Sequence, residues 1–245
     1  MRNFKKDTIV RKFIIAICIL ASLTNTTFGQ HTDLKEYGLK GKVKNILTMH
    51  YKDVMFFHGQ WLPISFEKFS YSTDWHFNEN GFLDTLKTSI LVNSDSLVTS
   101  ILAYEFKNEK KISGKYFNYN GDVTELHKIN WTDQYTYTTI ATDTNGAKAF
   151  ESTIWLSNDF RENKGDFKSY ENGKLVFYEK YSDIFDSNGQ LIKGEFTNIE
   201  ENTNYFVLYN HIEFDENNNP IVTIQINITD WTIKKMTIRR IDYYE

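Results

Sequence analysis

The chain has 245 residues, 16% of them aromatic, and a formal net charge of −4 at pH 7. This mild acidic excess excludes nucleic acid from the expected partners, because a polyanion attracts basic surfaces. The single cysteine, Cys18, excludes a disulfide within the chain, and there are only two prolines. Many aromatic, Thr, Ile and Val residues with so few prolines are typical of long β-strands.

Residues 1–29 have the three parts of a secretory signal peptide. Five basic side chains precede an apolar run over residues 13–23, and small polar residues follow it. The run is too short to cross a bilayer of about 30 Å as a helix. Cys18 lies inside it without the small residues before it that a lipid anchor needs. We expect cleavage after Gly29.

The predicted product is an exported protein, periplasmic, on the cell surface or secreted, in which residues 30–245 form a single domain. No later run of about 18 apolar residues occurs, so no membrane span is expected once the signal is removed.

Alternation and turn residues predict strands along the whole remaining chain and no further helix. The two-residue period is clearest in residues 71–77 and 221–228. In chain order, we expect strands at residues 42–51, 64–77, 82–91, 97–106, 112–119, 122–130, 135–142, 149–156, 167–170, 174–181, on both sides of the turn in 183–198, and at 205–214, 221–228 and 231–244.

Asn-Gly pairs separate these strands and predict hairpin turns. The clearest is Asn188-Gly189, where we expect a type I′ turn, which needs a positive φ at both central residues. Asn218 replaces glycine in a further turn, and asparagine tolerates the left-handed conformation. The structural turn residues are Asn80, Gly81, Asn120, Gly121, Asn145, Gly146, Asn172, Gly173, Asn188 and Gly189.

Hairpin after hairpin predicts an all-β fold, an antiparallel meander of consecutive β-hairpins that forms an extended twisted sheet. The alternative is a closed or partly closed barrel.

A short pattern recurs at residues 77–83, 117–123 and 185–191: an aromatic residue, two residues, Asn-Gly, one residue and an apolar residue. The segments 185–189 and 214–217, with an aromatic followed by Asp, resemble the turns of YD-repeat (Rhs-like) proteins. Residues 165–175 resemble one unit of the MORN-repeat variant. The resemblance implies an exported bacterial β-hairpin scaffold without catalytic residues of its own.

The sequence offers no metal or cofactor motif. None of the six histidines has metal-ligand spacing, although His50 and His58 could face each other across a hairpin. The turn from Asp215 begins like a calcium loop but has Pro220 at the sixth position and Ile226 at the twelfth. We therefore expect no metal and no cofactor.

Catalytic patterns are equally sparse. No nucleophile motif occurs, and acidic pairs such as Glu195 and Glu213, which glycoside hydrolysis would need, arise by chance in an acidic β chain. Exposed tryptophans could stack on sugars or partner side chains, although core packing is the favoured interpretation. The candidate ligand-binding residues are Trp61, Trp75, Trp131, Trp155 and Trp231.

The favoured hypothesis is an exported non-catalytic module that binds a protein partner or a surface glycan, or has a structural role. A first alternative is a glycan hydrolase, which would need a cleft with two carboxylates about 5–10 Å apart and flanking tryptophans. A second is a small barrel that carries a lipid or another ligand in an apolar lumen.

Overall fold

Sixteen strands and one short helix make up the part of the chain that this computed structural model describes, residues 31–92 and 95–245. The predicted signal peptide and Cys18 lie outside the described residues and stay predictions. The elements are α2 (Asp33–Glu36), β1 (Val43–Tyr51), β2 (Val54–Phe57), β3 (Gln60–Pro63), β4 (Tyr71–Phe77), β5 (Leu83–Val92), β6 (Asp95–Lys107), β7 (Lys110–Asn118), β8 (Val123–Trp131), β9 (Thr136–Asp143), β10 (Lys148–Leu156), β11 (Glu162–Glu171), β12 (Lys174–Phe185), β13 (Leu191–Asn198), β14 (Thr203–Phe214), β15 (Pro220–Asn227) and β16 (Thr232–Tyr243).

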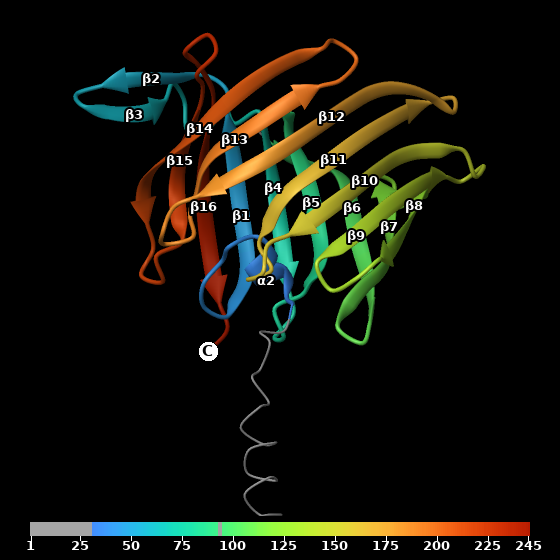
Figure 1. The fold of residues 1–245 in the computed structure, drawn as a ribbon. Helices are drawn as coiled ribbons and strands as arrows, with labels where there is room; N and C mark the ends of the chain where they lie inside the picture. Colours follow the sequence, from blue (N-terminus) through green and yellow to red (C-terminus); the bar gives the residue numbers. More distant parts are fainter. Residues whose placement is uncertain (1–30, 93–94) are drawn as a thin grey trace, which may run out of the picture. The chain divides into compact units, whose positions relative to one another are not determined.

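Fourteen of these strands form one closed antiparallel barrel (Figure 1). From β4 to β16 each strand pairs with its neighbour in the chain, and β1 closes the barrel by pairing with both β16 and β4. The all-β antiparallel meander predicted from the sequence is confirmed, and it forms the alternative closed barrel in place of the expected extended twisted sheet.

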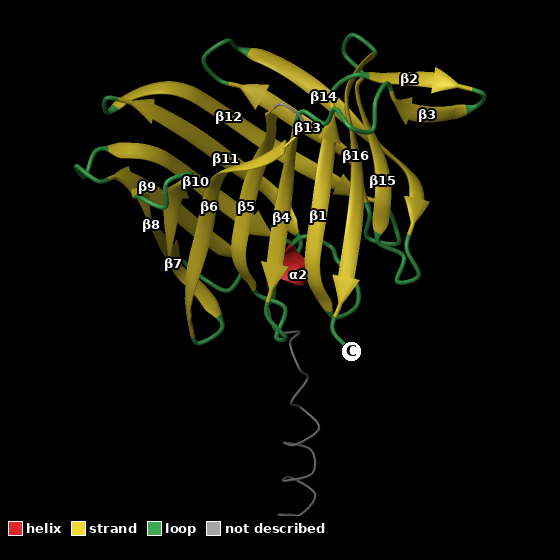
Figure 2. Cartoon of the chain, turned by 180° about the vertical axis from the view of Figure 1, so that it is seen from behind, coloured by secondary structure: helices red, strands yellow, loops and turns green. Residues whose placement is uncertain are grey.

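The barrel has two broad walls that lie on opposite sides of the lumen. Strands β8 to β14 are nearest the viewer in Figure 1, whereas β1, β4, β5 and β16 are nearest in the reverse view of Figure 2. Among the described residues, no helix is long and apolar enough to cross a membrane.

The turn at Asn188-Gly189 is not of the predicted type I′. At Asn188-Gly189 only Gly189 has a positive φ, of 79°, and its N–H donates to the Asp186 carbonyl at 3.0 Å. This is a type I turn followed by a left-handed glycine. The side chain at the first position fixes it, because Asp186 Oδ1 accepts from two backbone N–H groups at 2.9 and 2.8 Å.

The same arrangement, with Asn or Asp first and a left-handed residue fourth, recurs in the turns that begin at Asn78, Asn118, Asp143 and Asp215. In the last of these, Asn218 takes the glycine position with a φ of 62°. Among the five predicted pairs, only Asn172-Gly173 has a positive φ at both residues. This pair therefore forms the two-residue turn that was expected at Asn188-Gly189.

The apolar face of β15 points away from the lumen. Thr223 and Gln225 line the lumen cavity, so the alternating Val222 and Ile224 face outward. Both are buried in a cluster that includes Trp61 of β3, because the segment 54–69 covers the outside of the barrel there. The predicted strand over residues 64–77 is shorter than expected, since residues 64–70 belong to this covering loop.

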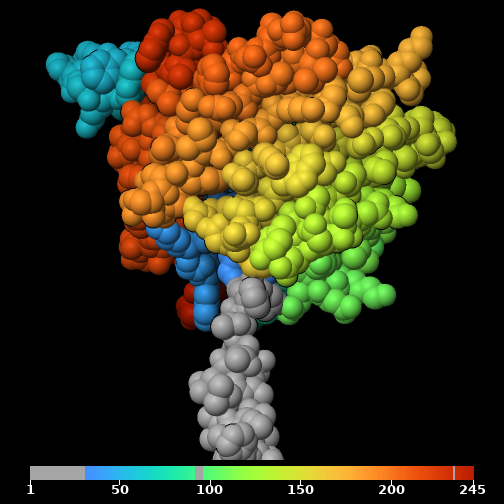
Figure 3. All heavy atoms as spheres, viewed as in Figure 1, coloured from blue at the N-terminus to red at the C-terminus, as the bar shows by residue number. Residues whose placement is uncertain are grey.

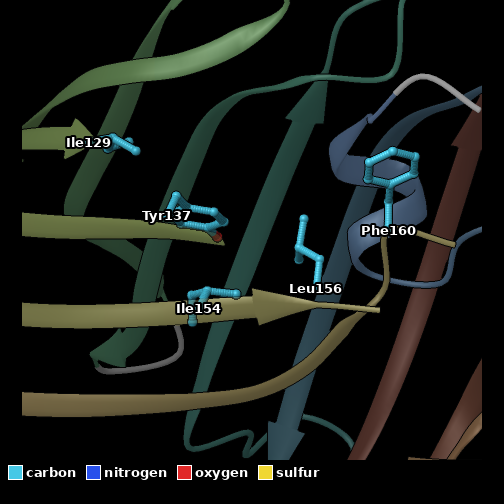
Figure 4. Close-up of a cluster of buried hydrophobic side chains, with 5 residues drawn as sticks. All are labelled: Ile129, Tyr137, Ile154, Leu156 and Phe160. Atoms are coloured by element: carbon cyan, nitrogen blue, oxygen red, sulfur yellow. The ribbon is translucent and has the colours of Figure 1, made fainter. Parts of the chain in front are cut away.

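Inside the barrel, one half of the lumen is packed with apolar side chains. Ile129, Tyr137, Ile154 and Leu156 project from β8, β9 and β10, and Phe160 lies beside the coil of α2 (Figure 4). A second cluster, around Val43 of β1 and Phe77 of β4, packs against Leu34, Tyr37 and Leu39 of the segment that contains α2. In the space-filling view, the blue atoms of this segment emerge beneath the yellow and orange strands (Figure 3). Residues 31–40 therefore form a plug in the lumen.

Candidate functional site: the lumen of the barrel

The plug, residues 31–40, is held by hydrogen bonds at both of its ends. The Leu83 N–H donates to Asp33 Oδ2 at 2.7 Å, which ties α2 to the start of β5. At the other end, the fully buried Asn219 exchanges two hydrogen bonds with the backbone of Lys40, at 2.7 and 2.8 Å. These contacts bring opposite ends of the chain together, so the plug is part of the folded barrel.

A buried ionic cluster lies where the plug meets β7. Lys111 Nζ is 2.6 Å from Asp33 and 3.7 Å from Glu36, and His31 Nε2 is 2.9 Å from Glu36. The Tyr137 hydroxyl donates to Glu36 Oε1 at 2.6 Å. Burial alone would raise the pKa of Glu36, but Lys111 and His31 outweigh it and the pKa is lowered.

His31, Asp33 and Glu36 are close enough together to resemble a metal site. The Lys111 ammonium, however, already lies against both carboxylates and supplies the positive charge that a metal would bring. The pKa of Lys111 is raised well above its usual range, because Asp33 and Glu36 outweigh the burial that would lower it. We therefore interpret the cluster as an internal salt bridge that anchors the plug.

A cavity of about 330 Å³ lies in the part of the lumen that the apolar clusters leave open. It lies between the end of the plug and strands β1, β4, β11 to β14, β15 and β16. A smaller cavity of about 230 Å³ lies toward β7, β9 and β10, and Tyr37 of the plug lines both.

One wall of the larger cavity carries a row of polar side chains. Cross-strand pairing places Tyr71, His50, Thr237, Thr223 and His211 side by side on five successive strands of the barrel, and all of them except Tyr71 line the cavity.

The two histidines of this row are held neutral. His211 Nε2 is 2.8 Å from the Leu191 carbonyl, which can only accept, so Nε2 carries the proton, and Nδ1 is 2.9 Å from the Thr223 hydroxyl. His50 stacks on Tyr71 with 4.1 Å between ring centroids, and both its ring nitrogens are buried without a hydrogen bond among the described residues. Burial, together with Lys235 and Arg239, lowers the pKa of His50 to about 4.

Arg239 stands next to this row, opposite Thr48 in the pairing of β1 with β16. Burial lowers the pKa of Arg239 below its usual value. Among the described residues, no ion pair includes the Arg239 guanidinium. The part of the cavity lining that β1, β14 and β16 supply is thus basic and lacks a carboxylate of its own.

Two carboxyls line the same cavity from β11 and β12. Burial raises the pKa of Glu162 to about 7 and that of Asp183 to about 7. Glu162 accepts a hydrogen bond from the Tyr181 hydroxyl. Near neutral pH each carboxyl is therefore partly protonated and can both donate and accept hydrogen bonds.

The structure does not bring the five candidate tryptophans together. Trp75 lines the cavity and donates to Thr73 Oγ1 at 3.0 Å. Trp131 donates to the Lys111 carbonyl in the packed half, and Trp61 belongs to the outer cluster. Trp155 lies beneath Lys164, and Trp231 is 74% exposed in the turn before β16. Only Trp75 therefore lies where a lumen ligand would meet it.

Other sequence-based candidates also lie elsewhere. Glu195 pairs with Lys193 at 2.7 Å and Glu213 is exposed, and neither lines the cavity. His50 lies in the lumen, whereas His58 is at the exposed tip of the β2–β3 hairpin, so the two do not face each other.

Sequence reasoning missed Glu162, Asp183 and Arg239. A signal for Asp183 was present, because it shares a strand face with the aromatic Tyr181 and Phe185. A charged residue between two aromatic residues of one strand face indicates a special environment.

The chain matches no protein-family model and no curated protein sequence. Among solved structures, it is similar to a porin-like protein from Bacteroides vulgatus, with a TM-score of 0.47 and 8% identity over 82% of this chain and 98% of that one. A porin-like protein from Bacteroides uniformis gives a TM-score of 0.44 and 9% identity, over 83% of this chain and 98% of that one.

Proposed function

We propose that this is an exported protein whose barrel binds a small molecule in its lumen. The observation that carries the proposal is the cavity of about 330 Å³ inside the closed barrel, lined by charged and aromatic side chains. Its volume is at the lower end of the range of small-molecule sites. Export rests on the predicted signal peptide alone.

The polar lining supports binding over a purely structural role. Burying a polar or charged group without a partner is costly, and an apolar lumen would be more stable. His50 nevertheless leaves both ring nitrogens without a hydrogen bond beside the cavity. Side chains kept in unfavourable surroundings are typical of functional sites.

Binding is favoured over glycan hydrolysis by the two acidic side chains. A hydrolase needs one protonated and one ionised carboxyl, so their surroundings push the two pKa values apart. Here burial raises the pKa of both Glu162 and Asp183 to about 7. The pair therefore fits hydrogen bonding to a ligand better than a division into acid and nucleophile.

The YD-repeat-like and MORN-like motifs have a structural place in this proposal. They supply the hairpins of the barrel, and the ligand is held by strand faces that the motifs do not specify. Binding of a protein or surface glycan by the tryptophans is less favoured, because those side chains are dispersed.

The test is a thermal-shift screen of the purified exported protein with neutral sugars, sugar acids, sugar phosphates and fatty acids. We expect at least one class to raise Tm, since a ligand at 100 times its Kd stabilises by about 2.7 kcal/mol. Gln225→Trp, which fills the cavity, should abolish the shift. Ser182→Trp, on the exposed face of β12 beside Asp183, is the matched control and should leave it intact. No shift with any class, or a shift that survives Gln225→Trp, would contradict the proposal.

A further inference from the structure

Arg239 is a cation without an anion. Its side chain lines the lumen cavity from β16, half-buried between the neighbouring strands. A guanidinium has five N–H donors and cannot lose its proton, so it cannot escape desolvation by becoming neutral. A group of this kind inside a protein is normally paired with a carboxylate or phosphate.

The side chains nearest to Arg239 supply no negative charge. Its cross-strand neighbour on β1 is Thr48, and the partner of Thr48 on β4 is Thr73. Both offer only hydroxyl groups. Burial lowers the pKa of both His50 and His211, Arg239 lowers them further, and both are neutral near pH 7. The wall is therefore arranged around a positive charge that the protein itself does not neutralise.

Asp183 is the natural partner that Arg239 does not use. Both side chains line the same cavity, yet no ion pair within 4.0 Å joins them among the described residues. Asp183 reaches the lumen from β12, in the wall opposite β16 (Figure 1 and Figure 2). The cavity separates the two, so a molecule in it would meet a guanidinium on one side and carboxyl groups on the other.

We propose that the lumen ligand is a small hydroxylated molecule that carries an oxyanion, either a carboxylate or a phosphate, and that Arg239 binds this oxyanion. The inference rests on the proposed function and names the ligand class of the same cavity. Asp183 and Glu162 then exchange hydrogen bonds with the hydroxyl groups of the ligand. The fork of the guanidinium suits two-point binding of either oxyanion.

Calorimetry with three probes built on the same hexose skeleton tests this: D-glucuronate, D-glucose 6-phosphate and D-glucose. We expect one or both anions to bind the wild-type protein at least tenfold more tightly than glucose. The first two probes separate a carboxylate from a phosphate ligand. Arg239→Gln should weaken anion binding on the order of 10- to 100-fold, because the variant loses the charge-assisted hydrogen bonds to the oxyanion. Arg239→Lys should retain part of the affinity.

The adjacent Arg240 provides a matched control. It is 75% exposed on the other face of β16, so Arg240→Gln removes the same charge and should leave anion binding unchanged. Thermal unfolding separates binding from a structural role. Loss of an unpaired half-buried charge should leave the Tm of Arg239→Gln equal to or above that of the wild type.

The inference would be overturned if glucose bound as tightly as the anions. It would also be overturned if Arg239→Gln kept the anion affinity of the wild type, or if both Arg239 variants showed a marked loss of Tm. Failure of the proposed function gives a different result from failure of this inference. If ligands do not bind in the lumen, charged and neutral probes alike should still bind to the filled-lumen variant Gln225→Trp. Absence of binding by all three probes would overturn the inference, whereas the proposed function would still be judged by the other classes in its screen.

Discussion

The ammonium nitrogen of Lys111 lies 2.6 Å from a carboxylate oxygen of Asp33, and neither side chain is more than 3% exposed. This contact joins β7 to the plug across 78 positions of sequence, counted from 33 to 111. A buried pair of this kind adds little net stability compared with apolar packing, but removal of one partner leaves the other charge uncompensated. The contact therefore makes the plug and the barrel depend on each other.

Lys111→Met should lower the free energy of unfolding by about 3–5 kcal/mol, because Asp33 and Glu36 would stay buried without their cation. Urea unfolding followed by tryptophan fluorescence measures the loss. Lys115→Met on the same strand is the control, since Lys115 is 50% exposed in its pair with Glu105 and its loss should cost about 1 kcal/mol or less. Similar losses in the two variants would refute the role assigned to the cluster.

Glu162 and Asp183 should make the protein less stable as the pH rises from about 4 to about 7. Their folded pKa values of about 7 exceed the ordinary values of 4.5 and 3.8, so the folded state holds protons that the unfolded state releases in this interval. Asp183→Asn removes one titration. As the pH rises from the unfolded to the folded pKa, the stability advantage of this variant over the wild type should grow by on the order of 1.4 kcal/mol for each pH unit. The advantage should reach a few kcal/mol and stay constant above pH 7.

Thermal unfolding across pH 4–8 measures this advantage. Glu171→Gln, at the exposed end of β11, is the matched control and should leave the pH profile unchanged. A parallel profile for Asp183→Asn and the wild type would show that Asp183 titrates normally.

His50 should act in the opposite direction. Its folded pKa of about 4 is below the ordinary 6.5, so the unfolded state takes up a proton first as the pH falls. The contribution of His50 to the free energy of unfolding is fully present above pH 6.5 and is lost as the pH drops toward 4. The loss amounts to at most about 3 kcal/mol. His50→Phe, which keeps a ring to stack on Tyr71, should lose this part of the acid sensitivity, whereas His58→Asn at the exposed hairpin tip should keep it. Equal acid sensitivity in all three proteins would count against the assignment.

The left-handed position of the hairpin turns predicts an order of stability among substitutions. Gly121 has a φ of 84° and open space around it, so only backbone strain opposes a side chain there. Gly121→Ala should cost about 1–2 kcal/mol. Gly121→Asn should cost less, because Asn218 already adopts this conformation in the β14–β15 turn. Chemical denaturation ranks the two, and an alanine variant as stable as the asparagine variant would contradict the assigned geometry.

Local chemistry made the strands predictable. Alternation and turn residues placed most strands of the barrel within a few residues, as in 221–228 against the observed Pro220–Asn227. The type of the turns was missed, because Asp186 and its counterparts act through side-chain hydrogen bonds that the Asn-Gly pair does not reveal. The four-residue helix α2 was also missed, since it is too short for a periodic pattern and its stability comes from Asp33 and Glu36 contacting distant strands.

By itself, the sequence determined an all-β chain of successive hairpins and, through each two-residue alternation, which side chains share a face. The tertiary structure alone decided that the sheet closes and which face lies inside. Closure depends on β1 pairing with β16 about 190 positions away, and no local pattern encodes such a pairing. Segment 54–69 covers the apolar face of β15 from outside, which leaves Thr223 and Gln225 inside. That choice places His50, Asp183 and Arg239 around one cavity, and the candidate site exists only because of it.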